Sequence, residues 1–226
     1  MLGQRSEPDP FIDAFTGLIA ARALSVAVML GVFEGLHEGP ATPAELAERR
    51  GLHPLGTETL LTTLTTLGYV EADGDGRARN TEISERKLVS SSPESIANFI
   101  GLQCDLDWEV LDMLPAAVRD GEAYALHEQR HDDAHWEGYM RGLFEISRHE
   151  QEANAKLVPV VSPERMVDVA GGHGGFAMAM CRLHPGLKAT VLDLPPAAAI
   201  GRQIVAEEGF ADSVEFVEGD VFELGL

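Results

Sequence analysis

The first hydrophobic pattern along the chain has the period of an α-helix. Apolar side chains recur three or four residues apart from Phe11 to Leu30, which predicts an amphipathic helix that ends at Gly31. Thr42-Pro43 followed by Glu45 resembles a capping box, because the Thr hydroxyl and the Glu carboxylate can each accept a backbone N–H. A short second helix is therefore expected to begin at Pro43 and to end at Gly51.

Two further elements complete the first part of the chain, residues 1–92. Regularly spaced leucines predict a third helix over residues 57–67, capped by Thr57 and ended by Gly68. Residues 69–81 read as two short strands around a Gly-rich turn. The order helix, helix, helix, hairpin predicts a mainly α, winged-helix-like region.

The charge of this region argues against binding to DNA. Residues 1–90 hold more acidic than basic side chains, and residues 56–67, where a recognition helix would lie, contain neither Lys nor Arg. Helices that read DNA grooves supply Arg, Lys, Asn or Gln to base edges and basic residues to phosphates. A packing and dimerisation module is therefore the better interpretation.

The second part, residues 93–157, is expected to be a helical linker. A helical stretch opens at Ser92-Pro93 and continues past Trp108, and Pro115 does not obviously break it. Residues 136–156 predict a further helix, whose Met140 and Phe144 are expected in the core.

Three histidines in this part have a spacing that two explanations fit. His127, His131 and His135 are four residues apart, so on a continuous helix they would share one face and could bind a metal. No HExxH pattern accompanies them, and a helix through Asp132-Asp133 is uncertain. A surface or substrate-lining cluster is preferred, and no metal site is predicted.

The third part, residues 158–226, alternates between short apolar runs and helical patterns. A buried strand is expected over residues 165–170, further strands over residues 189–195 and 214–220, and helices over residues 176–183 and 197–208. Parallel strands with right-handed crossovers follow from this order. The pattern predicts an α/β, Rossmann-like half-domain of three strands.

A glycine loop and two acids carry the candidate chemistry of this part. Gly171-Gly172-His173-Gly174-Gly175 joins the first strand to its helix, where small residues let a ligand approach the backbone N–H groups. Asp193 ends the second strand, where an acid can accept hydrogen bonds from ribose hydroxyls, and Asp220 ends the third strand, where it can reach the next part of a nucleoside. Together they predict a ligand that contains adenosine; the simpler alternative is that both acids cap helices.

Two cofactors fit the glycine loop. Residues 172–177 satisfy the pattern GxGxxA, so NAD is formally allowed. Residues 168–174 instead resemble the glycine motif of class I methyltransferases, which bind S-adenosylmethionine and place an acid inside the first strand, as Asp168 is here.

The chain as a whole resembles the small-molecule O-methyltransferase family that includes plant caffeate enzymes and bacterial polyketide and phenazine enzymes. The family joins a winged-helix dimerisation region, a helical linker and a Rossmann-like methyltransferase domain. The segments that carry the resemblance are residues 23–33, 42–47, 136–140, 167–174, 192–195 and 219–222.

The resemblance implies a role for individual residues. The methionine part of S-adenosylmethionine would lie on the glycine loop, the ribose on Asp193, the adenine near Leu194 and its edge on Asp220 and Val221, while Met140 would touch the methyl acceptor. The loop residues concerned are Ala170, Gly171, Gly172 and Gly174. Ala170 departs from the family, which usually has glycine there; its methyl group either crowds the cofactor or is tolerated because φ is negative, and both alternatives stay open here.

The resemblance also implies chain beyond residue 226, with the later strands and the His that acts as general base on the acceptor hydroxyl. The chain is therefore expected to be truncated at its C-terminus, and the catalytic residues stay unknown. His173 is interpreted as a loop residue, not as this base.

Composition and charge limit the remaining alternatives. The formal net charge of −20, from 37 acidic and 17 basic residues, argues against nucleic acid and against anionic membranes. No signal peptide is visible, and the apolar stretch 18–32 is expected to be too short to span a bilayer. Cys104 and Cys181 match no metal spacing and are interpreted as reduced core thiols of a cytoplasmic protein.

The sequence thus favours an S-adenosylmethionine-dependent O-methyltransferase, a homodimer that acts on a hydroxyl of a small, aromatic or secondary-metabolite acceptor. Two alternatives stay open here: a non-catalytic cofactor-binding or dimerisation protein of the same family, and an NAD-binding regulator with a winged helix. The identity of the acceptor is not encoded in any motif.

Overall fold

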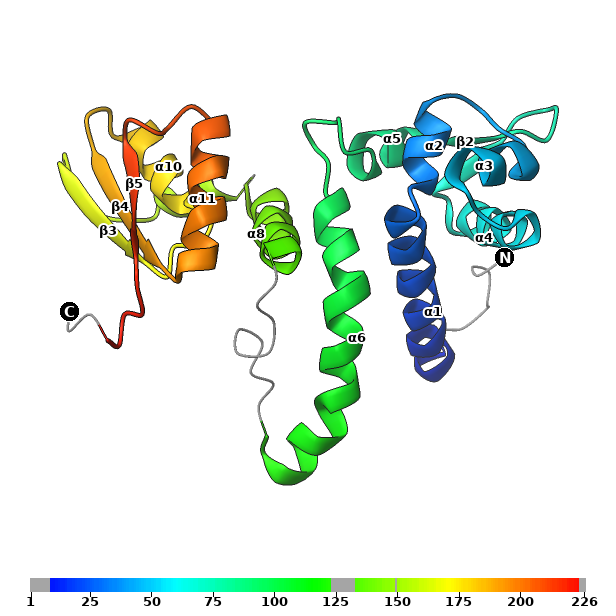
Figure 1. The fold of residues 1–226 in the computed structure, drawn as a ribbon, viewed down its shortest axis with the longest axis horizontal. Helices are drawn as coiled ribbons and strands as arrows, with labels where there is room; N and C mark the ends of the chain where they lie inside the picture. The colour runs from blue at the N-terminus through cyan, green and yellow to red at the C-terminus, as the bar shows by residue number, and fades with distance from the viewer. Residues whose placement is uncertain (1–8, 123–132, 149, 224–226) are drawn as a thin grey trace. The chain divides into compact units, whose positions relative to one another are not determined.

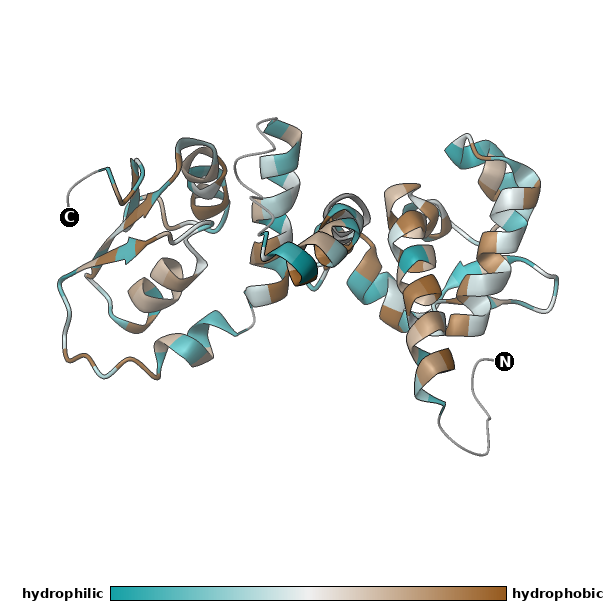
Figure 2. Cartoon of the chain, turned by 90° about the horizontal axis from the view of Figure 1, so that it is seen from below, coloured by the Kyte–Doolittle hydropathy of each residue, from teal (hydrophilic) through white to brown (hydrophobic). Residues whose placement is uncertain are grey.

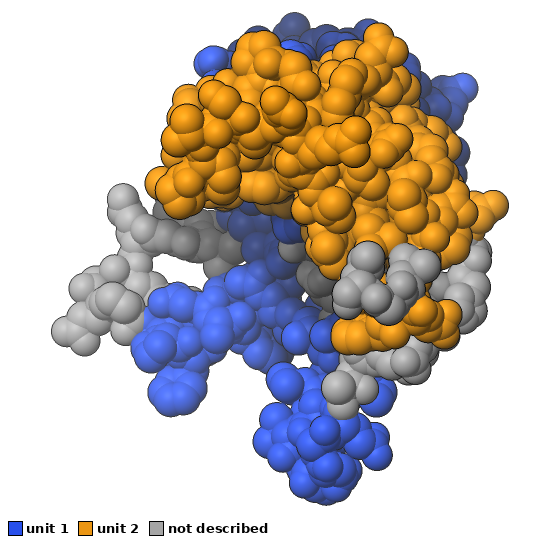
Figure 3. Space-filling view, turned by 90° about the vertical axis from the view of Figure 1, so that its left-hand side faces the viewer, with its two compact units in different colours: residues 1–122 blue, residues 123–226 orange. Residues whose placement is uncertain are grey.

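The computed structural model describes residues 9–122, 133–148 and 150–223. The chain divides into two compact units, residues 1–122 and 123–226 (Figure 3). Helices from the region 93–157 occur in both units. The three-part division at residues 92 and 157 stays a prediction.

The first unit is built from helices and one short hairpin (Figure 1). Its elements are α1 (Pro10–Met29), α2 (Val32–His37), α3 (Pro43–Arg50), α4 (Pro54–Leu67), β1 (Val70–Ala72), β2 (Ala78–Asn80), α5 (Glu82–Leu88) and α6 (Ala97–Asp120). The two strands pair antiparallel, with Val70 opposite Asn80. The expected order of three helices and a hairpin is confirmed, and α2 and α5 are additions to it.

Local signals set most of these helix ends. The capping box is present: the Thr42 N–H donates to Glu45 Oε2 at 2.7 Å, and the Glu45 N–H donates to Thr42 Oγ1 at 3.3 Å. The prediction that Thr57 caps the next helix is wrong. α4 begins at Pro54, and the Thr57 hydroxyl donates to the His53 carbonyl from inside the helix. Proline at the first helical position is favoured because it has no N–H that needs a partner.

α1 places much of its apolar surface in solvent. The helix is 20 residues long and, by length and composition alone, is apolar enough to cross a membrane, a test that core helices of soluble proteins and signal sequences also pass. Residues 18–32, the stretch expected to be too short, only overlap this longer helix. The side chains of Phe11 and Phe15 are 85% and 67% exposed. Figure 2 shows this helix, near the N-terminus, with brown hydrophobic residues along its length.

The second unit contains a three-stranded parallel sheet. Its elements are α8 (Asp133–Ser147), α9 (Gln151–Ala155), β3 (Arg165–Val169), α10 (Gly175–Leu183), β4 (Lys188–Asp193), α11 (Pro195–Glu207) and β5 (Val214–Glu218). The strand order is β3-β4-β5, and both pairs are parallel. The predicted Rossmann-like half-domain is confirmed.

Among the described residues one face of this sheet is covered and the other is largely open, although Leu192 of β4 is buried there. Met166, Ala189 and Val191 face the core that α10 and α11 complete. Val167 and Val169, on the opposite face of β3, are 62% and 50% exposed. The expectation that residues 165–170 form a buried strand is therefore only half right, because burial requires cover on both faces of a parallel sheet.

α8 is fixed on α11 by one arginine. Arg141 Nη1 and Nη2 donate to the two carboxylate oxygens of Glu207 at 2.8 and 2.9 Å, and Arg141 also pairs with Glu137 one turn away. The continuous helix predicted over residues 136–156 is wrong, because α8 ends at Ser147 and α9 begins at Gln151.

Candidate functional site

The glycine loop lies between the carboxyl end of β3 and the start of α10. Gly172 and Gly174 have φ of +56° and +73°, a conformation that side chains disfavour. A Cβ on Gly171 would lie 2.6 Å from the Asp168 carboxyl carbon, and one on Gly174 would lie 2.9 Å from Val205. Each of these glycines is therefore required by backbone conformation, by close packing or by both.

Ala170 opens the loop in an unexpected conformation. Its φ is +55°, whereas its methyl group was expected to be tolerated at negative φ. The Ala170 N–H donates to the Leu192 carbonyl at 2.8 Å, which extends the pairing of β3 and β4 by one residue. At this φ the backbone lies in a region where alanine is strained.

Asp193 joins the end of β4 to the glycine loop. Its Oδ2 accepts the Gly172 N–H at 2.7 Å, and its Oδ1 accepts the Leu194 N–H at 2.7 Å. A carboxylate has about four acceptor positions, so two stay available to a ligand. α11 begins after Leu194 and has no side-chain cap, so Asp193 does not serve as the helix cap of the simpler interpretation.

Asp168 is a half-buried acid beneath the same loop. Its Oδ2 atom is buried and accepts no hydrogen bond from any residue that the structure describes. Burial, and secondarily the negative charge of Asp193, raise the pKa of the Asp168 carboxyl above its ordinary value. Two acids close to one another, with one oxygen unsatisfied, are suited to a positively charged ligand group.

The third expected acid lies at the same edge of the sheet. The Gly219 N–H donates to the Asp193 carbonyl at 3.0 Å, which places the segment after β5 beside the end of β4. Asp220 Oδ1 accepts the Phe222 N–H at 2.8 Å, and Val221 follows it half-buried. The carboxyl ends of all three strands therefore supply the residues that sequence reasoning singled out.

α8 lies against the loop from the other side. A Cβ on Gly172 would meet Met140 Cε at 3.3 Å, and Met140 itself is buried, as expected. The Phe144 and His173 rings meet edge to face with centroids 5.4 Å apart, and Ser147 Oγ lies 3.3 Å from His173 Nε2. Sequence reasoning missed Ser147 and treated Phe144 only as a core residue. Phe144 follows Met140 by four residues and Ser147 follows it by seven, and this helical spacing is the signal that could have found them.

His173 is a neutral structural residue of the loop. Its Nδ1 accepts the Gly175 N–H at 3.0 Å, and burial lowers its pKa to about 4. A general base near neutral pH needs a free nitrogen and a pKa near the working pH, and His173 has neither. This agrees with its interpretation as a loop residue.

The histidine cluster falls largely outside the described residues. His127 and His131 lie in the segment 123–132, which the structure does not describe. His135 is buried on α8 and stacks on Tyr139 with ring centroids 6.0 Å apart. Among the described residues no group of three His, Cys, Asp or Glu side chains could hold a metal ion. Cys181 is buried, and the side chain of Cys104 is not described.

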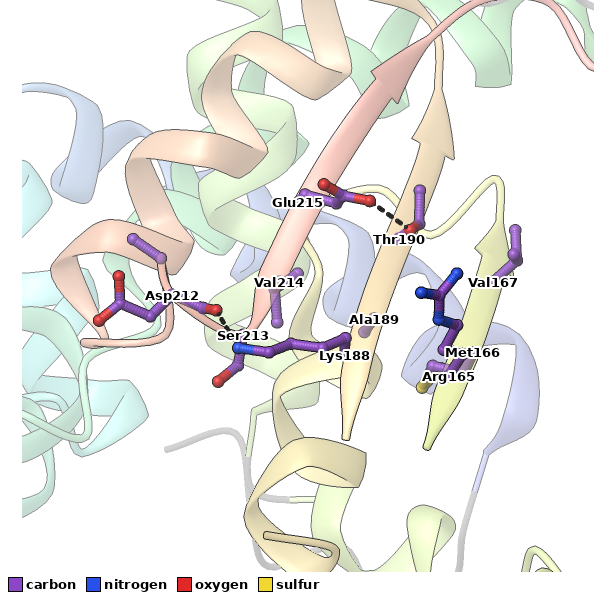
Figure 4. Close-up of a pocket in the computed structure, with 11 residues that line it drawn as sticks. Arg165, Met166, Val167, Lys188, Ala189, Thr190, Asp212, Ser213, Val214 and Glu215 are labelled. Carbon is purple, nitrogen blue, oxygen red and sulfur yellow. Dashed lines mark hydrogen bonds between the residues drawn. The ribbon is translucent and has the colours of Figure 1, made fainter. Parts of the chain in front are cut away.

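A hollow of about 440 Å³ lies at the opposite end of the sheet from the glycine loop (Figure 4). Its lining includes Arg165 and Lys188, the first residues of β3 and β4, and Val214, the first residue of β5. Lys188 Nζ donates to the Asp212 carbonyl at 2.7 Å, and Thr190 Oγ1 donates to Glu215 at 2.8 Å. Ligands of open α/β sheets bind at the carboxyl ends of the strands, so this hollow is not the candidate site.

Two family models match the chain. Residues 12–90 match the O-methyltransferase dimerisation domain, and residues 116–226 match the O-methyltransferase domain. The first match covers α1 to α5, and the second begins within α6 and covers the glycine loop and all three parallel strands.

Curated relatives match most of the chain. The 3-hydroxy-5-methyl-1-naphthoate 3-O-methyltransferase of Streptomyces sahachiroi is 30% identical over 224 residues, which are 95% of this chain and 64% of the relative. The N,N-dimethyltransferase OxyT of Streptomyces rimosus is 32% identical over 88% of this chain and 60% of its own length. The chain thus spans somewhat less than two thirds of the length of these two relatives.

A solved structure supports the same assignment. Human N-acetylserotonin methyltransferase, solved in complex with S-adenosylmethionine, superposes with a TM-score of 0.81 at 28% identity, over 97% of this chain and 68% of that one. Fold, glycine motif and both family models agree. The chain belongs to the O-methyltransferase family that joins a dimerisation domain to a methyltransferase domain.

Proposed function

We propose that the protein binds S-adenosylmethionine at the carboxyl ends of β3, β4 and β5 and serves as an O-methyltransferase for a small-molecule hydroxyl acceptor. The observation that carries the proposal is the pairing of the glycine loop with Asp193, whose carboxylate receives the Gly172 N–H. The proposed cofactor contacts are Ala170, Gly171, Gly172, Gly174, Asp193, Leu194, Asp220 and Val221.

The residues present fit this cofactor in two respects. The glycine loop carries no side chain except that of His173, so a ligand can lie close to its backbone, and Asp168 keeps a buried carboxylate oxygen that no described residue hydrogen-bonds. When bound, S-adenosylmethionine supplies an electrophilic methyl group on positively charged sulfur. A cation near Asp168 would favour the ionised carboxylate, which burial otherwise disfavours.

Each side chain of the site has a separate task in this proposal. Asp193 holds the ribose through its remaining acceptor positions, and Asp220 and Val221 hold the adenine edge. Met140, which packs beside Gly172, forms part of the acceptor wall and keeps water from the reacting atoms. Alignment of donor and acceptor supplies much of the rate in such transfers.

The names of the relatives support the proposed class of acceptor. One is named for methylation of a hydroxynaphthoate oxygen, and another is named as an N,N-dimethyltransferase. We propose that the acceptor is an aromatic compound or another secondary metabolite and that the methylated atom is a hydroxyl oxygen. The proposed assembly is a homodimer formed through the dimerisation domain, in the cytoplasm.

Calorimetry with the full chain tests the cofactor. We expect S-adenosylmethionine and S-adenosylhomocysteine to bind, and Asp193→Ala to lose about tenfold or more in affinity, because hydrogen bonds to a charged group are lost. Asp212→Ala is the matched control, since Asp212 is an exposed acid at the other end of the sheet. NAD is expected not to bind. Equal affinity in Asp193→Ala and wild type would overturn the assignment.

A transfer assay with radiolabelled methyl donor and a panel of hydroxynaphthoates and amines then tests the reaction. Methylation of a hydroxyl supports the proposed function. Binding of the cofactor without transfer to any acceptor would favour the non-catalytic alternative.

A further inference from the structure

One stripe of side chains on α8 lies along the glycine loop. Met140, Phe144 and Ser147 are four and three residues apart and therefore share a face of the helix. Met140 meets Gly172, and both Phe144 and Ser147 meet His173. Among the five residues 171–175 the sequence is Gly-Gly-His-Gly-Gly, so His173 supplies the only side chain larger than hydrogen.

The hydrogen bonds around His173 run in one direction. The Gly175 N–H donates to Nδ1, so the neutral ring carries its proton on Nε2. Nε2–H then points at Ser147 Oγ, 3.3 Å away, and the Ser147 hydroxyl donates to the Leu143 carbonyl at 2.7 Å. A chain of three hydrogen bonds therefore connects the start of α10 with the backbone of α8.

From this connection we infer that His173 is a positioning residue that holds the glycine loop and α8 as one body. A ligand that orders the loop then also orders α8, and with it the Met140 side of the acceptor site. By thermodynamic reciprocity, an acceptor that orders α8 raises the affinity of the loop for the cofactor by the same factor. The inference rests on the proposed function, because it requires a ligand on the loop.

Hydrogen exchange in α8 measures this coupling directly, with S-adenosylhomocysteine as the probe. In the wild-type chain we expect the probe to slow amide exchange across residues 133–147 by about fivefold or more. A purely structural role of His173 would change stability but would not transmit the presence of the probe to α8.

Two variants break the connection from opposite sides. In His173→Asn the shorter side chain keeps an acceptor for the N–H two residues later but does not reach Ser147. Ser147→Ala leaves the loop unchanged and removes the hydroxyl. Both are expected to bind the probe and to lose the slowed exchange in α8, whereas Ser147→Thr keeps a hydroxyl and retains it. Ile146→Ala, at an exposed position of the same helix, is the matched control and is expected to behave like wild type.

A double-variant cycle gives an independent measurement. If His173 and Ser147 act through each other, the variant that combines His173→Asn with Ser147→Ala has the same probe affinity as His173→Asn alone. If the two losses multiply, the side chains act independently and the inference is wrong.

The outcomes separate this inference from the proposed function. If the wild-type chain binds no probe, the proposed function fails and the inference falls with it. If the wild type binds and α8 is slowed equally in wild type and both variants, only the inference is overturned. If His173→Asn does not fold, Ser147→Ala and Ser147→Thr decide the question, because Ser147 lies outside the loop.

Discussion

The backbone of Ala170 adopts a conformation that an alanine side chain disfavours. Its φ of +55° lies in the left-handed region, where a Cβ costs roughly 1–2 kcal/mol. The Ala170 N–H donates to the Leu192 carbonyl, which is a tertiary contact at the same residue. An alanine does not itself signal a positive φ, although the glycine that is usual at this place in the family would.

Ala170→Gly is expected to stabilise the protein by about 0.5–1 kcal/mol, because relief of strain exceeds the added entropy of the unfolded chain. Urea unfolding measures the change. Gly172→Ala is the counterpart: it puts a Cβ at φ +56°, 3.3 Å from Met140 Cε, and is expected to destabilise. A less stable Ala170→Gly variant would show that the backbone at residue 170 carries no strain.

Ionisation of Asp168 is expected to lower the stability of the folded protein and to raise its affinity for a cationic ligand. Its pKa is raised in the folded state, so the folded protein binds more protons than the unfolded chain between the two pKa values. Stability therefore falls as pH rises through that window, and affinity for a cationic ligand rises with pH through the same window. Asp168→Asn is expected to raise the free energy of unfolding at pH 7 by about 1 kcal/mol and to weaken cofactor binding.

Thermal unfolding and calorimetry from pH 4 to pH 8 check both signs for Asp168. Glu215→Gln is the control, since Glu215 is an exposed acid on the open face of the sheet. A variant that is both less stable and unchanged in binding would contradict this account of Asp168.

At the scale of helices and strands, the outcome of a prediction depends on whether a local sequence signal marks the element or its boundary. The capping box of α3 and the order of β3, β4 and β5 follow from neighbouring residues, and both are confirmed. The sequence predicts that α4 starts at a Thr57 cap, but the helix begins three residues earlier, at Pro54. The break between α8 and α9 carries no Gly or Pro, so sequence periodicity could not reveal it.

The capping box gives a prediction for α3. Thr42→Ala removes the hydroxyl that accepts the Glu45 N–H and is expected to cost about 1 kcal/mol of stability. The backbone N–H of Thr42 holds the pKa of Glu45 below its ordinary value. The Glu45 carboxylate therefore stabilises the fold at pH values above its ordinary pKa, and this stabilisation is lost as the pH falls through the lowered pKa. Urea unfolding at pH 7 and pH 4 tests this: the effect of Glu45→Gln is expected to shrink at pH 4, while Thr59→Ala, at an exposed position of α4, is the control.

At the scale of the whole molecule, α1 lies in the region that matches the dimerisation domain, and it exposes apolar side chains. Residues 12–90 match a dimerisation domain, and Phe11, Phe15 and Ile19 are exposed on α1. Apolar patches of this kind mark interaction surfaces on soluble proteins. The high acidity of the chain does not oppose this, since the described residues of α1 include only Asp13 and Arg22 as charged side chains.

Phe15→Glu is expected to convert a dimer to a monomer, because it places a charge in the apolar surface that the partner copy would cover. Sedimentation equilibrium over a hundredfold range of concentration measures the change. Val161→Glu, which alters an equally exposed apolar residue of the second unit, is the control and is expected to remain dimeric. A monomeric wild type at all concentrations would refute the proposed assembly.

The hydrogen bonds of His173 have a chemical consequence beyond positioning. An imidazole is a good nucleophile toward methylating reagents only through a nitrogen with a free lone pair. Nδ1 is engaged by the Gly175 N–H, and Nε2 carries the proton that faces Ser147. If the loop holds a methyl donor as proposed, neither ring nitrogen of His173 offers that donor a free lone pair.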